Sequence, residues 1–150
     1  MCAVSLAALP LATCVSIVTT DSVGYEFNTR EWPVVHFRFF GRLQIAELDQ
    51  YLTDADSVIA ENKPYACILD GLEMLTPGSD FIRRQAEWIR INSETLTRLN
   101  RGTAFVTESA MIIGLVRAVF YFQPFPSPYA FFKALPDAMT WVQECLTRPK

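Results

Sequence analysis

The segment that most limits how this chain can fold is residues 65–70, YACILD. It is an apolar run with too few polar residues for a strand that faces water on one side, so a central strand covered on both faces is expected. Helical spacings of apolar residues precede it over residues 44–62 and follow it from about Asp80 to Asn100. Crossover helices on both sides of a buried strand are typical of a parallel sheet with helices packed on it.

The rest of the chain repeats this alternation. Val35, Phe37 and Phe39 alternate with His36 and Arg38, which predicts one apolar and one mixed face for a strand over residues 34–40. The full pattern predicts strands over residues 15–19, 25–30, 34–40, 65–70, 103–107 and 129–132, and helices over residues 44–62, 80–100, 110–122 and from residue 135. We therefore expect one α/β domain over residues 1–150. It has a central, mostly parallel sheet of four to five strands with packed helices, preceded by one or two N-terminal strands.

Composition limits the function classes. The chain has 150 residues, of which 51% are hydrophobic and 19% charged, and this balance suits one globular domain. Its formal net charge of −3 disfavours a nucleic-acid surface, which needs concentrated Lys and Arg. No run reaches the roughly 18 apolar residues that a membrane-spanning helix requires.

Cysteine and histidine usage disfavours metal and disulfide sites. Cys2, Cys14, Cys67 and Cys145 are widely separated, and His36 is the only histidine. Zinc sites use clustered ligands, so no metal is expected, and the isolated cysteines favour a reducing, cytoplasmic setting. Residues 1–14 form an apolar N-terminal extension without the basic residues of a secretory signal, and export is the less favoured interpretation.

The usual catalytic motifs do not occur in the sequence. There is no GxSxG, no HExxH and no glycine-rich phosphate loop, and no cofactor is expected. His36 has no nucleophile near it in sequence, and Cys67 lies in the buried run, where a thiol is unreactive. The sequence favours a protein that is not an enzyme, and a small enzyme that uses His36 or Cys67 is the alternative.

The segment after the buried strand contains the first candidate site, formed by Asp70, Thr76, Ser79 and Arg83. Asp70 is expected to end the strand and to accept backbone N–H groups in a turn, with display to a partner as the alternative. Thr76 and Ser79 flank Pro77-Gly78 before a helix, where each is either a helix cap or a phosphorylation site. Arg83 lies on an arginine-bearing helix face that is either solvated or anion-binding.

An aromatic cluster late in the chain is the second candidate site. It comprises Phe120, Phe122, Phe125, Tyr129 and Phe131, with Arg117 and Lys133 beside it in sequence. These rings either complete the core around the last strand or form an exposed patch for a partner, an apolar ligand or a lipid.

The chain resembles the SpoIIAA-like (STAS) domains over residues 33–146, in their uncharacterised branch. The resemblance rests on VHFRFFG at residues 35–41, ACILD at 66–70, RGTAFV at 101–106 and AMTWV at 138–142. It implies a non-catalytic, bacterial protein-interaction or signalling module similar to anti-sigma-factor antagonists. Its protein partner would bind the loop after the central strand and the following helix, and a homodimer is a further option.

The resemblance also implies a regulatory serine at the start of the helix after the central strand. Here the corresponding stretch is MLTPGS at residues 74–79, and Ser79, or less closely Thr76, occupies the position. The Asp-Ser pair that precedes this serine in the family is absent. The alternative function is a small apolar-ligand or lipid-binding protein that uses the cluster at residues 120–132.

Overall fold

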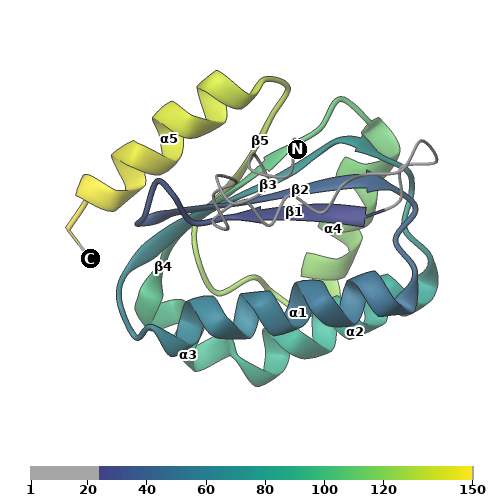
Figure 1. Cartoon of the computed structure of the whole chain (residues 1–150), viewed down its shortest axis with the longest axis horizontal. Coiled ribbons are helices and arrows are strands. Elements are labelled where there is room, and N and C mark those ends of the chain that lie inside the picture. Colours follow the sequence, from purple (N-terminus) through teal and green to yellow (C-terminus); the bar gives the residue numbers. More distant parts are fainter. Residues whose placement is uncertain (1–23, 150) are drawn as a thin grey trace, which may run out of the picture.

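The computed structural model describes residues 24–149 (Figure 1). The expected strand at residues 15–19, the extension at residues 1–14, and Cys2 and Cys14 lie outside this range. The described strands are β1 (Gly24–Asn28), β2 (Val34–Gly41), β3 (Tyr65–Met74), β4 (Asn100–Val106) and β5 (Tyr129–Phe132). The helices are α1 (Ile45–Ala60), α2 (Ser79–Ile91), α3 (Ser93–Leu99), α4 (Ala110–Phe122) and α5 (Leu135–Thr147). Among residues 24–149, no helix has the length and hydropathy needed to cross a membrane.

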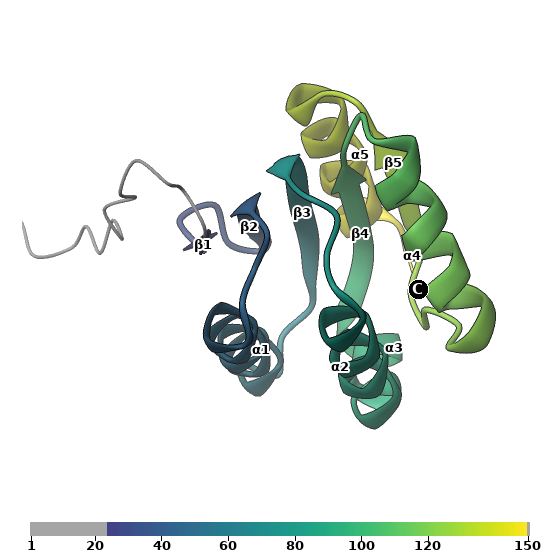
Figure 2. The same ribbon diagram turned by 90° about the vertical axis from the view of Figure 1, so that its right-hand side faces the viewer.

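The strands form one sheet in the order β1-β2-β3-β4-β5. Strands β2 to β5 are parallel, and β1 pairs antiparallel with β2, so the predicted mostly parallel sheet is confirmed. From β2 to β5, each new strand is added beside the preceding one and on the same side of it. Because the crossover connections are right-handed, the helices that join these strands all lie on one face of the sheet. Helix α5 follows the last strand and covers the other face, opposite α1 and α2 (Figure 2).

The first core lies between the sheet and helices α1 to α3. The predicted apolar face of β2 is confirmed, since Val35, Phe37 and Phe39 are all buried here. The buried residues of α1 are Leu48, Tyr51, Ala55 and Val58, whose spacing places them on one side of the helix. Ile45, at the first turn, is 56% exposed.

The second core lies under α5. Ala66 and Ile68 of β3 are fully buried against this helix, which confirms that residues 65–69 are covered on both faces. The approach of α5 to β4 is close at Gly102, where an added Cβ would lie 2.8 Å from Sγ of Cys145. Glycine at this position therefore lets α5 sit directly on the sheet.

The largest differences from the predicted elements are in β3 and in the helix predicted before β4. Strand β3 does not end at Asp70 but continues to Met74, because β2 shifts register between Arg38 and Phe40 and then pairs with this extension. The helix expected over residues 80–100 is interrupted at Asn92. There the side-chain Nδ2 donates to the carbonyl of Trp88 at 2.9 Å, an example of the local bonding by which asparagine competes with helix hydrogen bonds.

Candidate functional site

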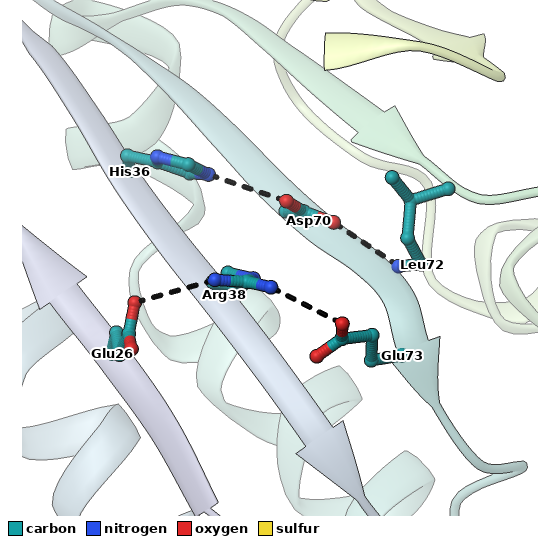
Figure 3. Close-up of polar contacts among 6 residues, drawn as sticks. All are labelled: Glu26, His36, Arg38, Asp70, Leu72 and Glu73. Carbon is teal, nitrogen blue, oxygen red and sulfur yellow. Dashed lines mark hydrogen bonds and ion pairs between the residues drawn. The ribbon is translucent and has the colours of Figure 1, made fainter. Parts of the chain in front are cut away.

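A row of charged side chains crosses β1, β2 and β3 on the face opposite α1 (Figure 3). Because successive side chains of a strand alternate between faces, His36 and Arg38 point away from the first core. Nη2 of Arg38 lies 3.2 Å from Oε1 of Glu73, and Nη1 of Arg38 lies 3.9 Å from Oε2 of Glu26. Helix α5 packs on β3, β4 and β5, so this row lies beside the helix.

Asp70 is the buried member of the row, with 4% exposure. The backbone N–H of Leu72 donates to its Oδ1 at 3.1 Å, and Nε2 of His36 lies 3.7 Å from its Oδ2. Burial raises the pKa of the carboxyl, but the contact with His36, the Leu72 hydrogen bond and the charge of Arg38 outweigh it, and the pKa is lowered overall. Asp70 thus accepts a backbone N–H as predicted, within the strand rather than in a turn.

The sequence did not indicate the partners of Asp70. Alternation placed His36 and Arg38 on a mixed face, but their neighbours depend on the register between strands. That register sets His36 beside Ile68 and Arg38 beside Asp70, and it brings Glu26 opposite Arg38. Glu26 and Glu73 were therefore missed.

The loop between β3 and α2 is short, and its first two residues contact neighbouring elements. The backbone N–H of Leu75 donates to the carbonyl of Gly41 at 3.0 Å. Oγ1 of Thr76 lies 3.3 Å from Sδ of Met111, at the start of α4. Leu72, Leu75 and Met111 are 45%, 59% and 65% exposed. We call these three side chains the carboxyl-edge patch, because they lie where the parallel strands end.

Ser79 and Arg83 lie next to this patch on α2. Ser79 is exposed and is the first residue of the helix, whereas Gly78 occupies the N-cap position. Gly78 rather than Ser79 is therefore the N-cap residue of α2. Arg83 pairs with Asp80 on the same turn. Thr76 thus lies in the loop after β3, and Ser79 and Arg83 lie at the start of α2, while Asp70 is buried within β3.

Four of the five rings in the predicted aromatic cluster pack together, and the fifth lies apart from them. Phe120, Phe125, Tyr129 and Phe131 pack on one another and on Phe105, with neighbouring ring centroids 4.8–6.2 Å apart. Their mutual packing fills the space between α4 and the last two strands. Phe122 is not part of this group and is 84% exposed.

A cavity of about 110 Å³ lies between α2 and α4, above β3 and β4. The chain thus has an apolar space, but it is displaced from the predicted aromatic cluster, and of the five predicted rings only Phe120 lines it. Its lining is almost entirely apolar and includes Leu69, Met74, Phe81, Ile82, Phe105, Ile112, Leu115, Val116 and Val119.

The two residues of the alternative enzyme hypothesis do not share a site. Cys67 belongs to the first core, and burial raises the pKa of its thiol to about 12. His36 lies on the opposite face of the sheet. A nucleophile–base pair needs hydrogen-bond contact, which a sheet between the two side chains prevents.

Comparisons with known proteins support the fold. The sequence matches no family model and has no significant match among curated proteins. An uncharacterised DUF3478-family protein with a SpoIIAA-like fold, from Shewanella loihica, has 16% identity and a TM-score of 0.58, covering 81% of this chain and 92% of that one. The anti-sigma factor antagonist SpoIIAA in its unphosphorylated form has 14% identity and a TM-score of 0.54, covering 81% and 97%. The chain therefore has a SpoIIAA-like fold.

Proposed function

We propose that this chain is a non-catalytic protein-interaction module whose partner binds the carboxyl-edge patch and the start of α2. The carrying observation is the patch itself, three exposed apolar side chains at the end of β3, in the loop after it and at the start of α4, where the loop contacts Gly41 and Met111. Clustered exposed apolar side chains on a fixed surface are typical of interaction sites. The likeness to an anti-sigma factor antagonist supports a regulatory role for this contact.

Replacing Leu75 by glutamate is expected to weaken partner binding at least about tenfold, equivalent to ~1.4 kcal/mol, because it places a charge in an apolar contact. The measurement is capture of partners by the immobilised protein, followed by titration of the captured protein. Ile91→Glu is the matched control, since Ile91 is 64% exposed at the opposite end of α2. Equal capture by Leu75→Glu and the native chain would contradict the proposal.

The proposal includes a regulatory switch, in which phosphorylation of Ser79 or Thr76 releases the partner from the patch. Thr76→Glu and Ser79→Glu add negative charge beside the patch, whereas Thr76→Ala and Ser79→Ala do not. If the switch exists, the glutamate variants release the captured partner and the alanine variants retain it. Identical capture by all four variants would remove the switch and leave the contact through Leu75 standing.

The cavity between α2 and α4 supports a second candidate function, the binding of a small apolar ligand. A dry apolar cavity of comparable size binds molecules such as benzene. Native mass spectrometry of gently purified protein, and thermal unfolding with added benzene, test this function. Val116→Phe narrows the cavity and is expected to abolish any ligand-dependent rise in Tm, while Ala46→Phe, on the surface of α1, retains it. No co-purified ligand and no Tm shift in the native chain would contradict it.

A further inference from the structure

The outward face of α4 is apolar and uncovered by any described element. The helix lies at the margin of the molecule (Figure 2) and carries one charge, Arg117. Of its thirteen residues only Ile112 is buried. Met111, Tyr121 and Phe122 are 65%, 83% and 84% exposed, and Gly114 and Ala118 are exposed between them. We call these five residues the α4 stripe, because helical spacing places them on one side.

Gly114 has no packing function within the described chain. A Cβ built at this position would meet nothing within 4 Å. An interior glycine weakens a helix relative to alanine, and close approach of another backbone is a common reason to keep one. Residues 24–149 contain no such backbone at Gly114, so the position is open to a surface outside the described chain.

Four of the five stripe residues are placed symmetrically about Val116, and Phe122 lies beyond them. Met111 and Tyr121 lie five residues before and after it, and Gly114 and Ala118 lie two residues before and after it. Two copies of this helix in antiparallel contact place Met111 against the partner's Tyr121 and Gly114 against the partner's Ala118. Large side chains then meet at the ends while small residues let the backbones approach in the middle. Such self-complementarity is the requirement for a two-fold symmetric interface.

The area of the stripe, rather than its charge, agrees with this occupant. Residues 109–136 contain no acidic residue, and the Arg117 guanidinium lies 5.4 Å from the Phe131 ring of its own chain, at the border of the stripe. Two largely exposed aromatic rings contribute roughly 300 Å² per copy. When Met111 and the small residues are added, the area buried per copy approaches the lower end of stable interfaces, about 600 Å² per copy. A weak dimer is expected, and it should tighten in salt, which screens the two Arg117 side chains.

We propose that the α4 stripe is a self-association surface on which a second copy of this chain docks through its own α4, antiparallel. This surface shares Met111 with the carboxyl-edge patch, but Leu75 and Gly114 each belong to only one of the two surfaces, so variants at these positions distinguish partner binding from self-association.

Sedimentation velocity over a concentration series, up to roughly 200 μM where an interface of this size is populated, tests the proposal. The native chain is expected to form a dimer. Gly114→Leu should shift the association at least tenfold toward monomer while the circular dichroism spectrum is unchanged, because the monomer has open space at this position. Gly114→Ala, which keeps the surface nearly flat, should still dimerise. A monomeric native chain, or a Gly114→Leu dimer of native affinity, would overturn the proposal.

Cysteine cross-linking tests the direction of the pairing in a Cys2→Ser, Cys14→Ser background, where the remaining described cysteines are buried. Disulfides require Cα atoms about 4.4–6.8 Å apart. Gly114→Cys mixed with Ala118→Cys should form a cross-linked heterodimer on mild oxidation. Cross-linking of Gly114→Cys with itself and not in the mixture would overturn the antiparallel geometry. Binding of lipid vesicles by a chain that stays monomeric would assign the stripe to a membrane and overturn the proposal.

Discussion

Replacing Ile68 by alanine is expected to lower the free energy of unfolding by about 2–5 kcal/mol, the range found when a large buried side chain is truncated. Ile68 is 0% exposed and faces the second core under α5. Its neighbours on the adjacent strands are His36 and Ala104, and both strands are fixed by parallel pairing. The backbone therefore has little freedom to close the space that the substitution leaves.

Urea unfolding followed by circular dichroism measures this loss. Leu72→Ala is the matched control, because it removes the same number of carbon atoms from the same strand at a side chain that is 45% exposed. The control is expected to change the free energy of unfolding by less than about 1 kcal/mol. A loss below this value for Ile68→Ala would show that β3 is not the centre of the fold.

Replacing Asp70 by asparagine is expected to lower the free energy of unfolding by about 1–3 kcal/mol at neutral pH, the range for hydrogen bonds to charged groups. Asparagine keeps the shape of the side chain, and its Oδ1 still accepts the N–H of Leu72. What is lost is the negative charge that faces His36 and Arg38. The measurement is again urea unfolding, repeated at a series of pH values.

The pH dependence of the Asp70→Asn effect has a defined sign. The pKa of Asp70 is lower in the folded chain than its ordinary value, so the folded state favours the ionised carboxylate. Its contribution to stability is fully present above the unfolded pKa, near 3.9, and is lost as the pH falls through the lower, folded pKa. The difference between the native chain and Asp70→Asn should therefore shrink below about pH 4.

Glu108→Gln is the control for general acid effects, since Glu108 is exposed and belongs to none of the ion pairs in the described part of the chain. The difference in the free energy of unfolding between the native chain and Glu108→Gln should not shrink as the pH falls. A difference between the native chain and Asp70→Asn that stays constant down to pH 3 would contradict the role assigned to the charge.

Much of the fold could be predicted because it depends on local patterns. The continuous apolar run at residues 65–69 indicated a strand covered on both faces, and the alternation of Val35, Phe37 and Phe39 indicated which side of β2 is buried. The helix at residues 110–122 and the strand at 129–132 have the predicted bounds. In each case a local pattern of apolar residues, either periodic or continuous, determined the result.

The errors arise where the structure depends on contacts between distant residues. The extension of β3 to Met74 exists because β2 offers Phe40 and Gly41 as pairing partners, and a single sequence does not show register. The charge row on His36, Arg38 and Asp70 was missed for the same reason. The apolar cavity depends on the spacing between α2 and α4, which side-chain periodicity does not encode. The functions assigned to Thr76, Ser79 and Arg83 stay predictions.

The strictly sequential order of the strands bears on how the chain is built during synthesis. Each strand from β2 onward pairs with the one made just before it, so the sheet grows in one direction with few distant segments to bring together. Each parallel pair still joins two strands across a helical crossover, and pairing of this kind is intrinsically slow. Helix α5 is made last and supplies the only described helical cover for Ala66 and Ile68. A nascent chain that stops before Leu135 therefore presents a bare apolar sheet face, the surface most open to chaperones and aggregation.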